Sequence, residues 1–293
     1  MRTACSSLAG RAKVDVEMGE MLRENKSVNP TAPDGIQNNP KDWMVQCRSW
    51  VGKWDWLLHC TTTRFFPDGS KRVSDELRKL QSAAGISSPM PVAYCRQRHT
   101  NRVAIVTQEA AEKASWQGEI VFDGTDGLVT DQPGIALAVY TADCVPLFLV
   151  EETIPVVALV HAGWRGTLAS IARETVSAMS SLGANPERIQ AWIGPAICGV
   201  CYEVSDELLQ TFIERFSHLA SAAEFCRGRM LDLPKLNALQ LQAAGVPDAQ
   251  ISNSKLCTFH EKQRFYSYRA EGERAGRLIS MIGITSPAKS TWE

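Results

Sequence analysis

The sequence predicts a single mixed α/β domain that extends from about residue 41 to residue 293. Short runs of β-branched and other apolar residues, bounded by turn residues, recur along the chain and are typical of buried strands. These strand-like runs outnumber the helical segments and occur singly between them, which indicates a mixed sheet architecture. No internal repeat of about 20–50 residues is visible, so the pattern is not that of a solenoid.

Composition places the chain among ordinary globular proteins, with 44% hydrophobic and 22% charged residues in 293. A chain of this length can bury a sizeable core without disulfides or a structural metal. The 31 Lys and Arg nearly balance the 32 Asp and Glu, so no single-sign field favours nucleic acid or a membrane as a partner. Nine cysteines at irregular spacings fit free thiols in a reducing compartment. Without a long apolar run or a signal-like start, we expect a cytoplasmic protein.

The N-terminal third is expected to begin with a poorly ordered extension over residues 1–40, because residues 25–40 are rich in Asn, Pro and polar residues. A tryptophan-rich segment follows at 43–66, where clustered tryptophans are typical of core or interface anchors. The apolar pattern then predicts strands over 57–63, 91–95 and 102–107, and helical segments over 74–84 and 110–116.

The C-terminal half alternates helices and strands. Apolar residues at helical spacing predict a helix over 167–182, ended by Gly183. Ser205 caps a second predicted helix, and a third runs from Pro234, a favoured first-turn residue, to Ala244. The remaining apolar runs predict strands over 189–193, 251–259, 265–269 and 278–284.

The stretch from Ile135 to Gly166 organises the centre of the chain. Its first apolar run, 135–150, is interrupted at Thr141-Ala142-Asp143-Cys144, and its second, 155–160, stops at His161. Two buried strands would therefore hold the thiol of Cys144 and the imidazole of His161 in neighbouring positions. If Asp143 lies in a strand, its side chain points to the face opposite that of Cys144.

Cysteine sulfur and histidine nitrogen are the ligands that zinc prefers, and a catalytic zinc site uses three of them with one position left open. The chain has only five histidines, and His99 lies between two predicted strands, so His99, Cys144 and His161 form an economical ligand set. From spacing alone, a buried structural thiol and a core histidine are the favoured interpretation of Cys144 and His161. The Cys198-Gly-Val-Cys201 pair would by itself suggest redox or metal chemistry, but it is the single Cys-x-x-Cys of the chain and lies in a Gly-Pro turn, so we interpret it as structural.

Four stretches, TADCVPLFLV, LVHAGWRGT, IGPAICGVCYEV and FYSYRAEGERAGR, resemble in this order the YfiH/YlmD family, once called multicopper polyphenol oxidase or laccase-like. The resemblance spans roughly residues 56–284. It implies a layered α/β/β/α sandwich and a zinc-dependent purine nucleoside phosphorylase that also deaminates adenosine and cleaves methylthioadenosine. The resemblance places the metal ligands at His99, Cys144 and His161. The family pattern Gln-Val-His-Gly is replaced here by Gln-Arg-His-Thr around His99.

The resemblance implies purine nucleosides and inorganic phosphate as substrates. It also implies that the protein is a monomer or a homodimer. Phosphate calls for forked cationic donors, which arginine supplies better than lysine. The catalytic candidates are Asp143 and Arg165. The candidates for binding substrate or phosphate are Arg64, Gly163, Arg165, Cys257 and Arg269. Gly163 and Arg165 precede a predicted helix, where backbone N–H groups can meet an anion. Zinc can activate water for deamination and act as a Lewis acid.

Three other functions remain open from the sequence. Cys144 and His161 could be the nucleophile and base of a hydrolase or deamidase, a role that a metal-bound thiolate cannot fill. A copper-dependent polyphenol oxidase, with copper as the less favoured metal, fits poorly because laccases use more than five histidines. A non-enzymatic scaffold could use the tryptophan-rich segment as a partner interface.

Overall fold

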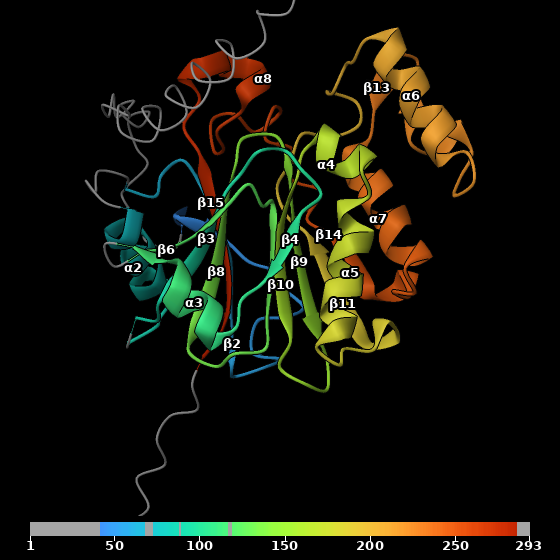
Figure 1. Cartoon of the computed structure of the whole chain (residues 1–293). Coiled ribbons are helices and arrows are strands. Elements are labelled where there is room, and N and C mark those ends of the chain that lie inside the picture. Colours follow the sequence, from blue (N-terminus) through green and yellow to red (C-terminus); the bar gives the residue numbers. More distant parts are fainter. Residues whose placement is uncertain (1–41, 68–72, 88, 117–118, 286–293) are drawn as a thin grey trace, which may run out of the picture. The chain divides into compact units, whose positions relative to one another are not determined.

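The computed structural model describes residues 42–67, 73–87, 89–116 and 119–285 (Figure 1). The extension expected over residues 1–40 lies outside the described residues. The fold is built on two large sheets, one of seven and one of six strands. The seven-stranded sheet contains, in spatial order, β1 (Met44–Val45), β2 (Leu57–Thr62), β15 (Leu278–Ile284), β8 (Ile135–Thr141), β3 (Val92–Arg96), β6 (Glu119–Asp123) and β5 (Ser115–Trp116).

The six-stranded sheet contains, in spatial order, β14 (Ile251–Asn253), β11 (Ile189–Ile193), β9 (Val145–Glu151), β10 (Val157–Ala162), β7 (Gly127–Thr130) and β4 (Val103–Ile105). A two-stranded ribbon is formed by β12 (Cys226–Arg227) and β13 (Met230–Leu231). The α-helices are α2 (Val73–Ala83), α3 (Gln108–Ala114), α4 (Trp164–Leu168), α5 (Ile171–Ser181), α6 (Asp206–Phe216), α7 (Leu233–Ala243) and α8 (Tyr268–Glu271).

Side-chain alternation along the strands produces four layers. In β8, Ala136 and Ala138 face the layer that contains α2, whereas Leu137 and Val139 enter the core between the sheets. In β9, the odd-numbered Leu147 and Leu149 instead pack with α5 and α7 on the outer face of the second sheet. Since successive strand residues point to opposite faces, each sheet is covered on both sides, and the predicted α/β/β/α sandwich is confirmed (Figure 1).

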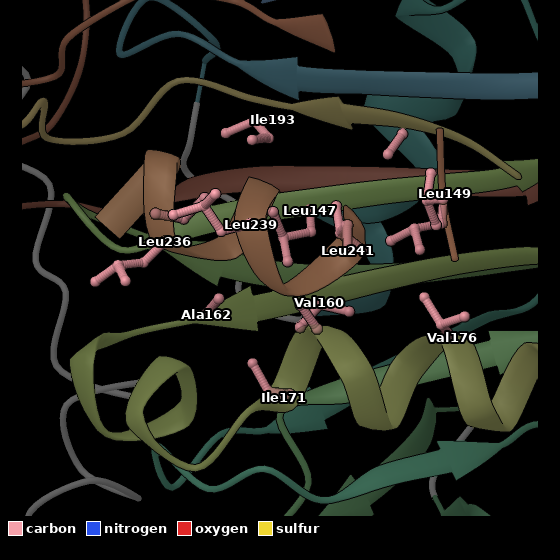
Figure 2. Packing of buried hydrophobic residues seen from close by; sticks show 14 of the residues in the cluster. Leu147, Leu149, Val160, Ala162, Ile171, Val176, Ile193, Leu236, Leu239 and Leu241 are labelled. Atoms are coloured by element: carbon pink, nitrogen blue, oxygen red, sulfur yellow. The ribbon is translucent and has the colours of Figure 1, made fainter. Parts of the chain in front are cut away.

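The outer face of the six-stranded sheet is the site of the largest apolar cluster (Figure 2). Val176 from α5 and Leu241 from α7 are 3% and 0% exposed, and both belong to the same cluster as Val160 of β10. Burying an aliphatic side chain of this size stabilises a fold by about 1.5–3 kcal/mol. This packing holds in place β9, which directly follows Cys144, and β10, which contains His161.

Phe148 anchors the core between the two sheets, where its side chain is fully buried and its ring centroid lies 4.8 Å from that of Trp192. We expect Phe148→Ala to lower the free energy of unfolding by about 3–5 kcal/mol, because the change leaves a cavity. The control Val51→Ala alters a side chain that is 59% exposed. It should change the free energy of unfolding by less than about 0.5 kcal/mol. Urea unfolding measures both, and equal effects would contradict the assigned core.

The helix predicted over 167–182 is wrong as a single element, because α4 and α5 are separated at Ala169 and Ser170. Ser170 adopts a positive φ of 65°. The carbonyl of Thr167, which would accept the next helical bond, instead accepts from the Gln240 side chain (2.8 Å) and from the Ser170 N–H (3.0 Å). A contact with α7, 73 residues away, therefore overrides local helix periodicity.

The strand predicted over 251–259 is confirmed only over its first three residues, and the strand predicted over 265–269 is wrong throughout. β14 ends at Asn253, whose side chain accepts a hydrogen bond from the Lys255 N–H at 2.7 Å. Lys255 itself has a φ of 57°, so the chain turns away from the sheet edge. Such local side-chain bonds compete with sheet pairing. The segment after Phe265 forms the short helix α8, capped by Ser267.

The remaining predicted elements are confirmed within one or two residues, including the Ser205 cap of α6, which accepts from the Leu208 N–H. Trp50 of the tryptophan-rich segment is buried in the core between the sheets. In the described part of the chain, no helix is both long and apolar enough to cross a membrane.

Candidate metal centre

Three connections that cross from the seven-stranded to the six-stranded sheet build one site. They join β3 to β4, β6 to β7 and β8 to β9, and they contain His99, Asp126 and Cys144 respectively. His161 comes from the end of β10, which pairs antiparallel with β9 so that Ala162 lies opposite Val145. The strand register therefore brings His161 beside the loop of Cys144.

The structure brings the three predicted ligands together. The side-chain nitrogen and sulfur atoms of His99, Cys144 and His161 lie within 4.8 Å of one another, and we call this group the His–Cys–His triad. The two imidazole ring centroids are 4.8 Å apart, with planes at 80°. His161 is buried, whereas His99 and Cys144 remain partly accessible to solvent. Partial access is what a substrate needs to reach such a centre.

Asp126 supports the triad from behind and is fully buried. Its Oδ1 lies 2.8 Å from Nδ1 of His161, which leaves the lone pair of Nε2 of that ring to bind a metal ion. The same carboxylate accepts hydrogen bonds from the backbone N–H groups of His99 (3.0 Å) and Thr100 (2.7 Å). A histidine ligand that donates its second N–H to a carboxylate is a recurring arrangement in metal sites. The residues present therefore fit a bound metal ion.

Asp126 is a functional residue that local sequence pattern does not indicate. Its only local signal is its position in the loop that precedes β7, two residues after Gly124. Its partners lie 26 to 35 residues away, so local pattern gives no indication of its role.

The His99 loop is shaped to present its imidazole even though it departs from the family pattern. His99 has a positive φ of 59°, which costs energy for a residue with a Cβ. Gln97 exchanges two hydrogen bonds with the backbone of Tyr140 in β8, at 2.7 and 2.8 Å. Thr100 donates its hydroxyl to Asp126 at 2.9 Å. These contacts fix both ends of the loop around His99.

Electrostatics favour ionised groups at this site in the metal-free protein. Burial raises the pKa of Cys144, but the charge of His161 and hydrogen bonds with His161 and His99 lower it to about 6. Burial lowers the pKa of His161, but the thiolate and Asp126 raise it to about 9. Burial raises the pKa of Asp126, but His161 and Thr100 lower it to about 2. A thiolate is thus available as a metal ligand at neutral pH.

Asp143 lies in the turn between β8 and β9 with a φ of 81°, so the strand position considered from the sequence is wrong. Its carboxylate accepts hydrogen bonds from the Thr258 hydroxyl and the Arg269 N–H, both at 2.6 Å. Its carbonyl accepts from the Ile197 N–H at 3.0 Å. Asp143 therefore ties two distant segments to the turn that presents Cys144.

The predicted arginines differ in how many protein groups already contact their guanidinium groups. Arg64 forms an ion pair with Glu271 at 3.1 Å, donates to the carbonyl of Lys262 and stacks on Tyr266. Arg269 donates to the carbonyl of Glu203 at 2.9 Å. These contacts hold the C-terminal segment in place and leave fewer donors for an anion.

Arg165 is exposed and stacks on its neighbour Trp164, with 4.2 Å from the guanidinium carbon to the ring centroid. Within the described ranges, no carboxylate lies within salt-bridge distance of Arg165. The helix expected to start after it begins instead at Trp164, as the five-residue α4.

Arg277 is a further cation of this region and is not among the arginines predicted from the sequence. Burial lowers its pKa, while the acidic groups of Cys144, Tyr268 and Asp143 act in the opposite direction. Its guanidinium donates to the carbonyls of Ala275 (2.7 Å) and Gly276 (3.1 Å). Among the residues that the structure describes, no carboxylate pairs with it. Its place at the end of the stretch FYSYRAEGERAGR is the signal that would have found it.

Gly163 lies against the triad. A Cβ at this position would come within 2.9 Å of Cδ2 of His99 and 3.1 Å of Sγ of Cys144. Its φ of −74° is open to any residue, so only crowding argues against a side chain. We expect Gly163→Ala to lower metal occupancy and activity while leaving the melting temperature nearly unchanged. Elemental analysis checks this, and full occupancy in the variant would contradict the assigned contact.

Cys257 is not part of the triad. Its sulfur lies with Cys198, Cys201 and His260 in a second group of possible metal ligands. It forms an isolated β-bridge with Ala196 and does not lie within a strand.

Comparisons with known proteins point to one family. The profile of the family described as multi-copper polyphenol oxidoreductase laccase matches residues 60–285. Purine nucleoside phosphorylase YlmD from Bacillus subtilis is 38% identical over 194 residues, covering 65% of this chain and 70% of the relative. Adenosine deaminase RL5 from an unknown prokaryotic organism is 37% identical over 218 residues, covering 73% and 83%.

Solved structures agree. The chain resembles the Bacillus licheniformis hypothetical protein YfiH with a TM-score of 0.73 and 28% identity, covering 83% of this chain and 97% of that chain. It resembles YlmD from Geobacillus stearothermophilus with a TM-score of 0.71 and 28% identity, covering 84% and 100%.

Proposed function

The chain belongs to the multi-copper polyphenol oxidoreductase laccase family, and we propose that it is a zinc-dependent purine nucleoside phosphorylase that also deaminates adenosine. The observation that carries the proposal is the convergence of His99, Cys144 and His161 in front of the Asp126 carboxylate. One thiolate and two imidazoles leave a position free on a tetrahedral ion, as catalytic zinc sites do. Relatives named for both activities support the reaction class.

The triad residues would hold the metal, which would supply Lewis-acid chemistry and activation of water. The chain itself would hold the ion in place. Asp126 keeps the Nδ1 proton of His161 and so presents Nε2, while its bonds to the His99 loop fix the second imidazole. Asp126, His99 and His161 would then need neither to move nor to transfer a proton when the substrate enters. Such a preorganised site favours catalysis.

Phosphate binding falls to cations near the triad. We assign it first to Arg165 and Arg277, which have no carboxylate partner in the described part of the chain. Arg64 would act mainly by positioning the C-terminal segment, since Glu271 already pairs with its guanidinium group. Arg269 is a third candidate for phosphate, because its guanidinium donates to a backbone carbonyl, that of Glu203, and has no carboxylate partner among the described residues. A guanidinium matches the paired oxygens of phosphate better than an ammonium does.

The proposed substrates are inosine, guanosine, adenosine and methylthioadenosine. Product analysis of each nucleoside with and without phosphate tests the proposal. We expect free base and ribose 1-phosphate, or its methylthio counterpart, only when phosphate is present, and inosine from adenosine without it. If no nucleoside releases its base in either condition, the proposal is wrong.

A second candidate function has one specific observation in its favour. Cys144, His161 and Asp126 also form the nucleophile, base and orienting carboxylate of a Cys–His hydrolase, with a Cys144 pKa of about 6. This alternative needs a free thiolate in the active protein, whereas the phosphorylase needs a metal-bound one.

Alkylation as a function of pH separates the two functions. In chelator-treated protein we expect iodoacetamide to modify Cys144 with a half-maximal rate near pH 6, because the folded pKa lies there. Burial raises the pKa of Cys60 and Cys95 to about 12, so these thiols serve as internal controls in peptide mapping. Added zinc should block the modification. Rapid alkylation of Cys144 in fully metal-loaded, active protein would favour the hydrolase.

A further inference from the structure

A second set of metal-ligating side chains lies outside the triad, and we call it the Cys/His cluster. It consists of Cys198, Cys201, Cys257 and His260, whose sulfur and nitrogen atoms all lie within 4.8 Å of one another. In sequence the four residues form a Cys-x-x-Cys pair and a Cys-x-x-His pair. Two such pairs from separate loops are the spacing from which structural zinc sites are built.

The interatomic distances approach those of a zinc tetrahedron. With zinc bonds of about 2.3 Å to sulfur and about 2.0 Å to nitrogen, ligand atoms lie roughly 3.5–3.8 Å apart. Sγ of Cys201 lies 3.1 Å from Nε2 of His260, the ring nitrogen that would bind the ion, while Sγ of Cys198 lies 3.9 Å from the other ring nitrogen, Nδ1. Small side-chain rotations would bring the four atoms to a common centre.

Two backbone N–H groups of the cluster point at one sulfur. Sγ of Cys257 accepts hydrogen bonds from the N–H groups of Cys198 (3.4 Å) and His260 (3.5 Å). Metal ligands are commonly held by such outer hydrogen bonds. The two loops are thus pre-positioned around Cys257, which is buried, while His260 closes the group from the solvent side.

We propose that the Cys/His cluster binds a structural zinc ion. Four protein ligands leave no position for substrate, in contrast to the three of the triad. A zinc ion here would replace the expectation from the sequence, which ranked metal binding by the Cys198–Cys201 pair behind a purely structural role. The proposal does not depend on the nucleoside chemistry, because it concerns a separate set of ligands.

The ion would brace one wall of the candidate active site. Ile197, next to Cys198, donates its N–H to the carbonyl of Asp143. Thr258, next to Cys257, donates its hydroxyl to the Asp143 carboxylate. Both loops of the cluster therefore contact the residue that precedes Cys144. Joining them through zinc would fix the turn that presents that ligand.

Metal counting on the full chain, purified without a polyhistidine tag and under reducing conditions, tests the proposal. We expect about two zinc ions per chain in the wild type and about one in His260→Ala. His260 is exposed, so its truncation does not threaten the core. The matched control His218→Ala alters another exposed histidine and should keep about two. His260→Cys should restore the second ion, since cysteine also binds zinc.

Two further readouts follow the same ion. Cobalt substitution of the wild type should give strong sulfur-to-cobalt charge-transfer bands, which weaken in His260→Ala more than in Cys144→Ser. Chelation should lower the melting temperature of the wild type more than that of His260→Ala. The proposal is overturned if His260→Ala retains the wild-type zinc content. It is equally overturned if the wild type holds a Cys198–Cys201 disulfide in place of the second ion under these conditions.

Discussion

His161→Ala is expected to reduce kcat/KM for inosine phosphorolysis by on the order of a thousandfold, since a bound metal contributes several kcal/mol to the transition state. The variant loses the most deeply buried ligand of the triad together with its bond to Asp126. It should also lose the triad metal while retaining an ion in the Cys/His cluster. Steady-state kinetics and elemental analysis on the same sample measure both effects.

His218→Ala is the matched control for this experiment, because His218 lies outside both groups of possible ligands. Its kcat/KM should stay within about twofold of the wild type, as expected of a surface change. An active His161→Ala variant with its metal content intact would remove the triad from the mechanism.

Asp126→Asn has the second largest expected effect. The amide can still accept a hydrogen bond but loses the charge that orients His161, so metal affinity should fall by about 10- to 100-fold. At limiting zinc, activity should fall with it, and excess zinc should restore most of kcat. A role limited to holding the backbone of His99 and Thr100 would predict a loss that zinc does not rescue.

The same substitution has a pH signature in the metal-free protein. The folded pKa of Asp126, about 2, lies below its unfolded value, so the carboxylate stabilises the fold above pH about 4. This contribution disappears as the pH falls through about 2. The difference in unfolding free energy between wild type and Asp126→Asn should therefore shrink on acidification in urea titrations. A constant difference would mean that Asp126 carries no charge in the fold.

Local sequence pattern predicts the strands well because side-chain alternation and burial are encoded within a few residues. The runs that became β8, β9 and β10 are continuous and apolar, and each is fully or nearly fully buried. Local pattern fails where side chains, whether near or distant in the sequence, bind the backbone in place of regular helix or sheet pairing. The α4–α5 break depends on Gln240, and the turn after β14 depends on side-chain bonds that periodicity does not report.

The candidate site shows the same division. Cys144 and His161 could be placed from the ends of apolar runs, and the small number of histidines pointed to His99. Asp126 had no pattern of its own, because its role arises from three connections that meet only in the fold. The ion pair of Arg64 with Glu271 joins residues 207 positions apart, which no local rule detects.

Anomalous X-ray diffraction from crystals of active protein, recorded on both sides of the zinc absorption edge, tests the central claim most directly. We predict a zinc peak at about 2.0–2.3 Å from the nitrogen atoms of His99 and His161 and the sulfur of Cys144. A fully active protein with no anomalous peak among these three residues would contradict the claim.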